Sequence, residues 1–158
     1  MAKKKKKGPA KQTPVIKNKK AYFNFEILEQ YEAGLVLKGT EIKSLRAGSA
    51  SLGDAFAIIK RGEVWLIKSY IAPYEHGSYA NHEPMRKRKL LLHKREIRKL
   101  ETKIKERGFT LVPLRIYINQ KGIAKCMLGL ARGKKKYDKR ETIKKRDVER
   151  ELRRRLKN

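Results

Sequence analysis

Apolar residues in this chain recur first at every second position and later at every third or fourth, and this change of period predicts its elements. From Tyr22 to Ile27 apolar and polar side chains alternate, which is typical of a strand. Ala33 and Gly34 then interrupt the chain before a short apolar strand over residues 35–37. The pattern therefore predicts two strands before residue 38.

Two hairpins are predicted farther along the chain. Residues 54–60 and 63–70 read as strands joined at Arg61-Gly62, a pair of residues that suits a tight turn. Residues 109–118 and 123–131 form the second hairpin across residues 119–122. Pro113 lacks a backbone N–H for the ladder, so we expect it at an edge or a bulge.

Helical periodicity appears twice between these strands. Thr40 is a suitable N-cap for a short helix that ends at Gly48. A longer helix is predicted over residues 93–107, where apolar residues are spaced by three and four and Gly108 stands at the C-cap.

The six short strands predict a mainly β fold with peripheral helices. Hairpin connections make the strands antiparallel, and closing them into a six-stranded β-barrel removes exposed edges. Most large apolar residues lie between residues 21 and 131, which is enough for one small core. We expect a single folded domain over residues 18–132, present as a monomer.

Charge is sorted along the chain. Residues 1–20 carry nine Lys and no acid, residues 21–85 carry six basic and eight acidic residues, and residues 86–158 carry 28 basic and eight acidic residues. A nearly neutral body between cationic ends, with a net charge of +27, calls for a polyanionic partner. RNA, DNA and an anionic membrane are the candidates.

Both cationic ends are predicted to lie outside the core. Residues 1–17 form a disordered basic arm, since its Lys, Gly and Pro residues cannot pack. Residues 133–158 form a basic tail in which Gly133 is a hinge and a helix starts near Glu141. That helix has few apolar residues, so we expect it to become ordered when a partner holds it.

The composition favours a cytoplasmic protein without a membrane segment. Cys126 is the single cysteine, which excludes an internal disulfide and fits a reducing compartment. No apolar run reaches the roughly 18 residues of a membrane span. The basic residues 1–7 are followed by no apolar segment, so they do not form a secretory signal.

Enzymatic motifs are missing from the sequence. There is no nucleophile elbow, phosphate-binding Gly loop or His-Glu-x-x-His pair. Two groups of residues are candidate metal ligands, namely His76, His82, His93 with Cys126, and Glu26, Glu29 with Glu32. The first matches no zinc spacing and the second fits an exposed strand edge, so we expect no metal, no cofactor and no catalysis.

Arg86, Lys87, Arg88 and Lys89 form a basic run beside the apolar residues 90–92. Attachment to the core would make this run a rigid cationic ledge for phosphates. Most aromatic residues look like core, so the sequence favours binding of a folded RNA by shape and phosphates over binding of an extended strand.

Four blocks of residues carry a resemblance to a known family. They are Glu32-Ala33-Gly34-Leu35, the run from Lys38 to Arg46, the run from Arg88 to His93, and the run from Gly133 to Arg140. In this order they resemble bacterial small protein B, the partner of transfer-messenger RNA in ribosome rescue. The resemblance extends from about Asn18 to the C-terminus.

The resemblance implies an oligonucleotide-binding-like barrel that grips the tRNA-like domain of transfer-messenger RNA. It also implies a tail that becomes helical on the ribosome, in the decoding centre and empty messenger channel of the small subunit, against ribosomal RNA. RNA contacts are implied at Asn18, Glu32, Leu91 and His93, to which we add the basic residues Lys19, Lys43, Arg46, Arg86, Arg88 and Lys89. The tail positions are Gly133, Lys134, Lys135, Tyr137, Asp138, Lys139 and Arg140. Some relatives have His at position 137 and Trp at position 148, where this chain has Tyr137 and Val148.

Several residues keep two interpretations on sequence alone. Glu32 either accepts hydrogen bonds from a base edge or caps a turn beside Gly34. His93 is an N-cap or an RNA contact, and Leu91 is core or an exposed stacking platform. Asp138 either pairs with a neighbouring cation or is the N-cap of the tail helix.

Two other classes of function compete with an RNA-binding adaptor. A structural ribosomal protein would share the charge and the tails, but it would stay on the subunits in high salt. A small RNA-processing enzyme would turn over RNA when purified.

Overall fold

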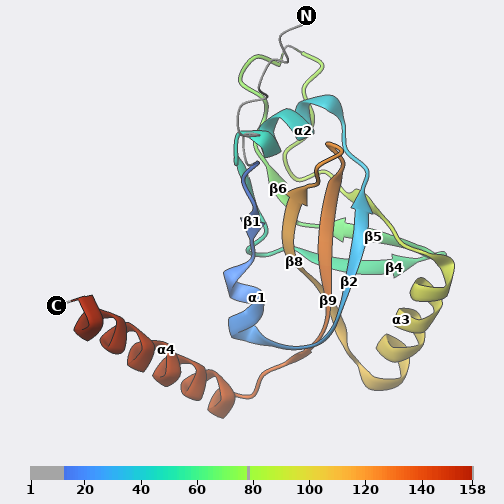
Figure 1. Cartoon of the computed structure of the whole chain (residues 1–158). Helices are drawn as coiled ribbons and strands as arrows, with labels where there is room; N and C mark the ends of the chain where they lie inside the picture. The colour runs from blue at the N-terminus through green and yellow to red at the C-terminus, as the bar shows by residue number, and fades with distance from the viewer. Residues whose placement is uncertain (1–12, 78, 158) are drawn as a thin grey trace, which may run out of the picture.

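Six antiparallel strands close into a ring in this computed structural model, which describes residues 13–77 and 79–157 (Figure 1). The strands are β2 (Phe25–Leu35), β4 (Phe56–Lys60), β5 (Glu63–Ile67), β7 (Arg88–Leu91), β8 (Thr110–Ile118) and β9 (Ala124–Gly133). They follow the order β8-β4-β5-β7-β2-β9, and β9 pairs back to β8 to complete the barrel. The predicted mainly β, six-stranded antiparallel barrel is confirmed.

Among the residues that the structure describes, three more short strands lie outside this ring. β1 (Ile16–Lys17) pairs with β8 at Ile116 and Arg115, so β8 has three partner strands. β3 (Ala50–Ser51) and β6 (Tyr70–Ile71) form a separate two-stranded sheet.

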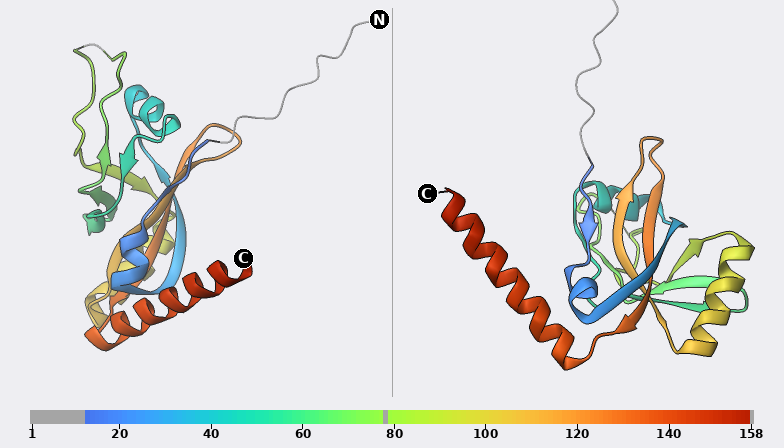
Figure 2. Two further views of the ribbon diagram at one scale, coloured as in Figure 1. Left: turned by 90° about the vertical axis from the view of Figure 1, so that its left-hand side faces the viewer. Right: turned by 60° about the horizontal axis from the view of Figure 1, so that its bottom comes forward.

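The described residues also form four helices: α1 (Lys19–Asn24), α2 (Gly39–Arg46), α3 (Lys94–Arg107) and α4 (Lys136–Lys157). α1 packs on the outer surface of β8 and β9, where Ala21 contacts Val112, Leu114 and Ala131. α4 runs away from the barrel on the side of α1 (Figures 1 and 2). Among the described residues, no helix is both long and apolar enough to cross a membrane.

The number of ring strands agrees with the prediction, but their boundaries do not. The break predicted at Ala33 and Gly34 is wrong, because β2 continues through both residues to Leu35. Residues 22–24, predicted as strand, belong to α1 instead. The sequence pattern missed β7, whose four residues are too few and too basic to show a period. The sequence pattern thus predicted β2 as two strands and missed β7, and the two errors cancel in the total of six.

Both predicted hairpins are present. Arg61 and Gly62 turn between β4 and β5 with φ angles of 52° and 71°, values for which glycine is suited. The register of β8 and β9 shifts between Pro113 and Arg115, which places the proline at a bulge as predicted. Gly108, with a φ of 64°, is the C-cap of α3.

The two chain ends depart from the predicted boundaries. Residues 13–17 were assigned to the disordered arm, yet β1 pairs with β8 and the Thr13 hydroxyl donates to the Ile118 carbonyl at 3.3 Å. Residues 1–12 of that arm lie outside the described residues. At the other end Gly133 is not a hinge but the last residue of β9, paired with Phe25.

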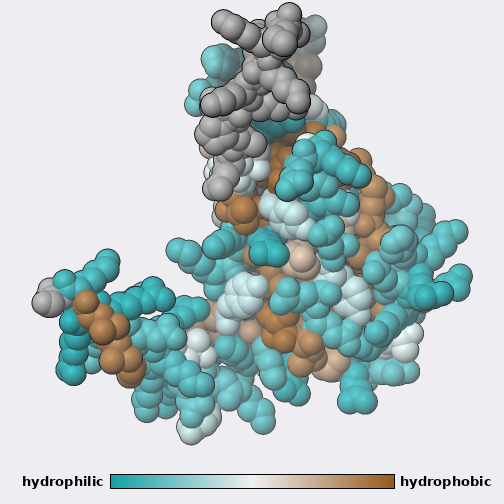
Figure 3. Space-filling view, viewed as in Figure 1, coloured by the Kyte–Doolittle hydropathy of each residue, from teal (hydrophilic) through white to brown (hydrophobic). Residues whose placement is uncertain are grey.

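The tail helix also starts earlier than predicted. α4 begins at Lys136 rather than near Glu141, so Asp138 lies in its first turn and is not its N-cap. In α2 the N-cap is likewise Lys38 and not Thr40. Polar side chains cover most of α4, with a hydrophobic strip near its C-terminal end (Figure 3). Its exposed apolar residues are Ile143, Val148, Leu152 and Leu156.

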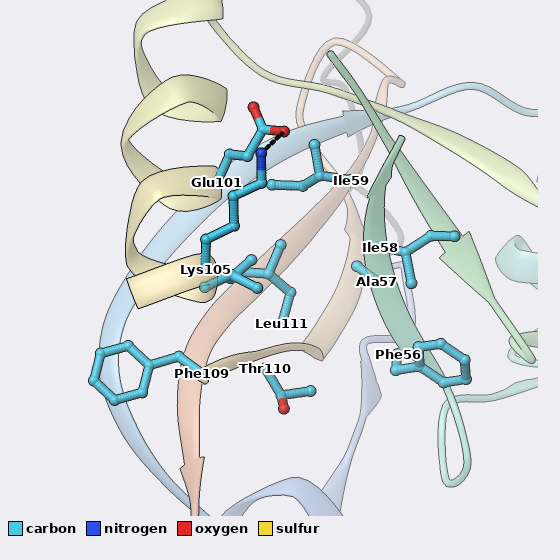
Figure 4. A pocket seen from close by; sticks show the side chains of 10 residues that line it. Phe56, Ala57, Ile58, Ile59, Glu101, Lys105, Phe109, Thr110 and Leu111 are labelled. Atoms are coloured by element: carbon cyan, nitrogen blue, oxygen red, sulfur yellow. Dashed lines mark ion pairs between the residues drawn. The ribbon is translucent and has the colours of Figure 1, made fainter. Parts of the chain in front are cut away.

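The shortest pairing between neighbouring strands of the ring is that of β4 with β8, where only Ala57 is paired with Leu111. A pocket of about 350 Å³ opens at this seam beside the last turn of α3 (Figure 4). Its walls are mainly apolar, and the Lys105 ammonium lies 3.3 Å from the Glu101 carboxylate at its edge. Because these two charges balance, the pocket adds nothing to the cationic surface.

Candidate nucleic-acid interface

Part of the outer barrel surface lies beside the patch that α1 covers, and we call it the open face. In an antiparallel ladder, directly opposed residues point to the same side of the sheet. Leu91 is opposite Gly34, Gly34 is opposite Lys125, and Lys125 is opposite Tyr117, which gives one row across four strands. A second row joins Glu32, Met127, Arg115 and Lys17. The open face consists of these eight residues.

Leu91 is an exposed residue of the open face and not part of the core. Its side chain is 53% exposed. A Cβ atom on Gly34 would lie 3.3 Å from the Cβ of Leu91, so the glycine leaves room for the leucine to lie flat on β2. Leu91 is therefore an exposed apolar side chain held in a fixed position on the sheet.

Glu32 lies in the middle of β2, which excludes the turn role that the sequence left open. Its side chain is 51% exposed, and its carboxylate accepts a hydrogen bond from the Tyr117 hydroxyl. The Lys125 ammonium is 4.0 Å from the other carboxylate oxygen. Tyr117 and Lys125 were not predicted as site residues; their place on the polar side of alternating strands was the available signal. Together they hold the Glu32 carboxylate in one orientation.

The cationic ledge predicted at residues 86–89 is mostly neutralised. Arg88, predicted as an RNA contact, is completely buried, so its guanidinium faces the protein interior in this structure. Its Nε lies 2.9 Å from the Glu41 carboxylate, and Arg86 donates to the same carboxylate at 2.8 and 3.1 Å. Lys89 pairs with Glu63 at 2.9 Å. Acids from other elements therefore pair with Arg86, Arg88 and Lys89, while Lys87 stays exposed.

Glu41 is the centre of this buried cluster. Burial alone would raise the pKa of its carboxyl, but hydrogen bonds from Arg86, from the Lys38 backbone N–H and from Arg88 outweigh burial and lower the pKa to about 2. Arg88 also donates to the Ser69 carbonyl, the Ser69 hydroxyl and the Pro84 carbonyl, at 2.7, 2.9 and 3.1 Å. The cluster thus ties α2, β7 and the segments around Ser69 and Pro84 together.

Asn18 also has a structural role. It is 3% exposed, its amide donates to the Pro113 carbonyl at 2.8 Å, and its carbonyl oxygen accepts from the Ala21 N–H at 3.2 Å. The side chain of Asn18, predicted as an RNA contact, makes its hydrogen bonds within the protein as the N-cap of α1. Asn18 positions α1 at the border of the open face.

The remaining predicted barrel residues are exposed. Lys19 is the first residue of α1, and Lys43 and Arg46 lie on the outer side of α2, with the Lys43 ammonium 5.1 Å from the centre of the Tyr74 ring. His93 is the N-cap of α3 through its backbone N–H, which donates to the Glu96 carboxylate at 3.2 Å. Its side chain stays exposed, so the two interpretations of His93 are compatible.

The histidine and cysteine side chains that were candidate metal ligands do not form a cluster among the described residues. His82 is buried and bonds through its ring to the Thr40 hydroxyl at 2.8 Å and the Ile71 carbonyl at 2.9 Å. Cys126 lies inside the barrel, where burial raises the pKa of its thiol to about 12. Within the described ranges, no three His, Cys, Asp or Glu residues converge on one point.

The start of the tail is fastened to α1. The Lys134 N–H donates to the Asn24 carbonyl at 2.9 Å, and the Lys134 ammonium donates to the Tyr22 carbonyl at 3.0 Å and the Thr142 hydroxyl at 3.1 Å. Lys134 is therefore not a free cation in this structure. Beyond it, the Tyr137 ring is 70% exposed. Residues 133–158 carry 13 basic and five acidic residues, which makes α4 a cationic arm.

Comparison with known proteins gives a direct result. The family model described as SmpB protein matches residues 15–158. The chain belongs to the SmpB protein family. The predicted family, small protein B, is thereby confirmed, and the match extends over β1 as well as the barrel and the tail.

SmpB relatives resemble this chain over nearly their whole length. The SsrA-binding protein of Thermus thermophilus is 58% identical, over 88% of this chain and 96% of the relative. The SsrA-binding protein of Staphylococcus carnosus is 50% identical, over 100% of this chain and 99% of the relative. A solved structure described as "tmRNA-SmpB: a journey to the center of the bacterial ribosome" is 55% identical with a TM-score of 0.67, and the match covers 83% of this chain and 95% of that one.

Proposed function

We propose that this protein is a non-enzymatic adaptor that binds the tRNA-like domain of transfer-messenger RNA and delivers it to stalled ribosomes. Membership of the SmpB family supports this function, since relatives are named for binding SsrA and one was solved with tmRNA in a ribosome study. Its place of action is the cytoplasm, where ribosomes translate.

The observation that best supports RNA binding in this proposal is the arrangement of Glu32 and Leu91 on the open face. An acid in a cationic protein repels phosphates, so Glu32 suits a hydrogen bond from a base edge better than any backbone contact. Leu91 lies in the adjoining row as an apolar surface for stacking. Lys17, Arg115 and Lys125 supply positive charge around the two.

The tail supplies the ribosome contacts in this proposal. Gly133 and Lys134 fix where the tail leaves β9, and the exposed Lys135 precedes α4. The first turns of α4 carry Tyr137, Asp138, Lys139 and Arg140. A helix of 22 residues with many cations fits an RNA-lined channel such as the decoding centre and the empty messenger path. The Tyr137 ring replaces the His of some relatives as a stacking group.

Removal of α4 should leave RNA binding by the barrel nearly intact. The open face consists entirely of residues before Gly133, and β9 pairs up to that residue. A chain ending at Lys135 keeps this ladder and the Lys134 hydrogen bond to Asn24. We expect its dissociation constant for the tRNA-like domain to rise by less than about tenfold in a gel-shift assay at moderate salt. A larger loss would show that the tail takes part in this binding.

Replacing Glu32 by Gln should weaken RNA binding although it makes the protein more cationic. The variant keeps the shape and one acceptor oxygen but loses a charge-assisted contact, for which we expect a loss of roughly 1–3 kcal/mol. Binding by pure electrostatics has the opposite sign. Fluorescence titration at fixed salt, together with a thermal melt that shows unchanged stability, separates the two. Tighter binding would refute base recognition by Glu32.

A further inference from the structure

A groove of about 250 Å³ lies on the outer barrel surface where β1 meets β8. It is lined by Thr13, Val15, Arg115, Tyr117 and Ile118, and it continues the open face past Tyr117. We propose that this groove binds one unstacked nucleobase of the RNA that the open face holds. The proposal rests on the proposed function and adds a second base contact to it.

The walls of the groove suit a flat, partly apolar ligand. Val15 is 45% exposed and presents its methyl groups on one side, while the ring of Tyr117 forms another side. The Arg115 guanidinium lies 5.4 Å from the centre of that ring. Aromatic rings and guanidinium planes are the surfaces on which proteins stack splayed-out bases.

Charge around the groove favours a nucleotide over an apolar peptide. Arg115 is exposed, and among the residues that the structure describes no carboxylate forms an ion pair with it. Lys17 is directly opposite Arg115 in the register and is also exposed, so both cations lie on one side of the sheet. A base in the groove therefore has cations nearby for its own phosphate.

Tyr117 connects the groove to Glu32. Its ring lines the groove, and its hydroxyl donates to the Glu32 carboxylate. Burial, together with that hydrogen bond, raises the pKa of Tyr117 to about 12, so the hydroxyl stays protonated and remains a donor at neutral pH. The two base contacts, at Glu32 and in the groove, are thus held in a fixed relation.

The first test is binding of the full chain to a fluorescently labelled tRNA-like domain at fixed salt. Arg115→Lys keeps the charge but loses the planar stacking group, so we expect the dissociation constant to rise about fivefold or more. Arg107→Lys makes the same exchange at the exposed end of α3 and should bind like the parent. If the parent itself does not bind, both the proposed function and the proposed base binding in the groove are wrong. If the parent binds and Arg115→Lys binds equally well, only the groove is refuted.

A second pair of variants separates the ring of Tyr117 from its hydroxyl. Tyr117→Phe loses the hydrogen bond to Glu32 but keeps the ring, whereas Tyr117→Leu loses both. We expect the leucine variant to bind at least about threefold more weakly than the phenylalanine variant. Thermal melts of both variants show whether each is folded. Equal binding by two folded variants overturns the proposal.

Discussion

Replacing Asp138, Lys139 and Arg140 together by Ala is expected to abolish ribosome rescue while RNA binding by the barrel stays nearly unchanged. The three residues lie in the first turns of α4, away from the open face, so the change leaves the barrel surface intact. Rescue should fail because the tail loses the residues that start its docked helix. Tagging of a stalled peptide, measured at matched occupancy of transfer-messenger RNA, reports the loss.

Asp138→Lys distinguishes docking from charge in this experiment. Asp138 is the single acid between Gly108 and Arg140, and it lies near the N-terminal end of α4, where a negative charge stabilises a helix. A tail that only attracts phosphates works as well or better with an additional Lys. A tail that must dock as a helix with a defined start loses activity. Full rescue by Asp138→Lys would contradict the docking role.

Replacing Glu41 by Ala is expected to cost roughly 3–5 kcal/mol of unfolding free energy, because Arg88 is then buried without its carboxylate. The total free energy of unfolding of a domain is only about 5–15 kcal/mol, so this loss should lower the melting temperature strongly. Arg86 loses the same partner, although its side chain still reaches solvent. Thermal or urea unfolding measures the loss.

Glu63→Ala is the matched control for this change. Glu63 also forms an ion pair with a residue of β7, at 2.9 Å from Lys89, but both side chains are well exposed. Exposed pairs contribute about 0–1 kcal/mol, so this variant should be close to the parent. Equal losses from Glu41→Ala and Glu63→Ala would show that burial of the cluster has no energetic consequence.

The Glu41 cluster also predicts how stability depends on pH. The folded-state pKa of Glu41 is about 2, below its ordinary value of 4.5. Its contribution to stability is therefore complete above about pH 4.5 and disappears as the pH falls toward 2. Glu41→Gln removes this titration, so the stability of the variant should change less than that of the parent over the same interval.

Local patterns in the sequence predicted the elements that depend on nearby residues. The turn at Arg61-Gly62, the cap at Gly108 and the bulge near Pro113 each follow from the backbone of one or two residues. Pairing across the barrel is different. Gly34 looked like a break in the chain because glycine weakens an isolated strand, but its role here is to make room for Leu91 of β7.

The predicted site residues also differ in whether nearby or distant residues determine their environment. Exposed Glu32 and Leu91 follow from the resemblance, and the structure brings them into adjoining rows. The burial of Arg88 and Asn18 was not predicted, because a basic or amide side chain is usually exposed unless distant partners satisfy it. Those partners, Glu41 for Arg88 and the Pro113 carbonyl for Asn18, are 47 and 95 positions away in the sequence. Composition carries no information on such pairs.

The ladder between β2 and β9 joins the beginning of the barrel to its end, because Phe25 is paired with Gly133. Contacts between such distant residues form late in folding, after a long loop has closed. During synthesis β2 and β8 have emerged while their common partner β9 is still missing. The open face is therefore complete only after β9 has been synthesised. A fragment that stops before Ala124 leaves both strands with an unpaired edge and is prone to aggregate.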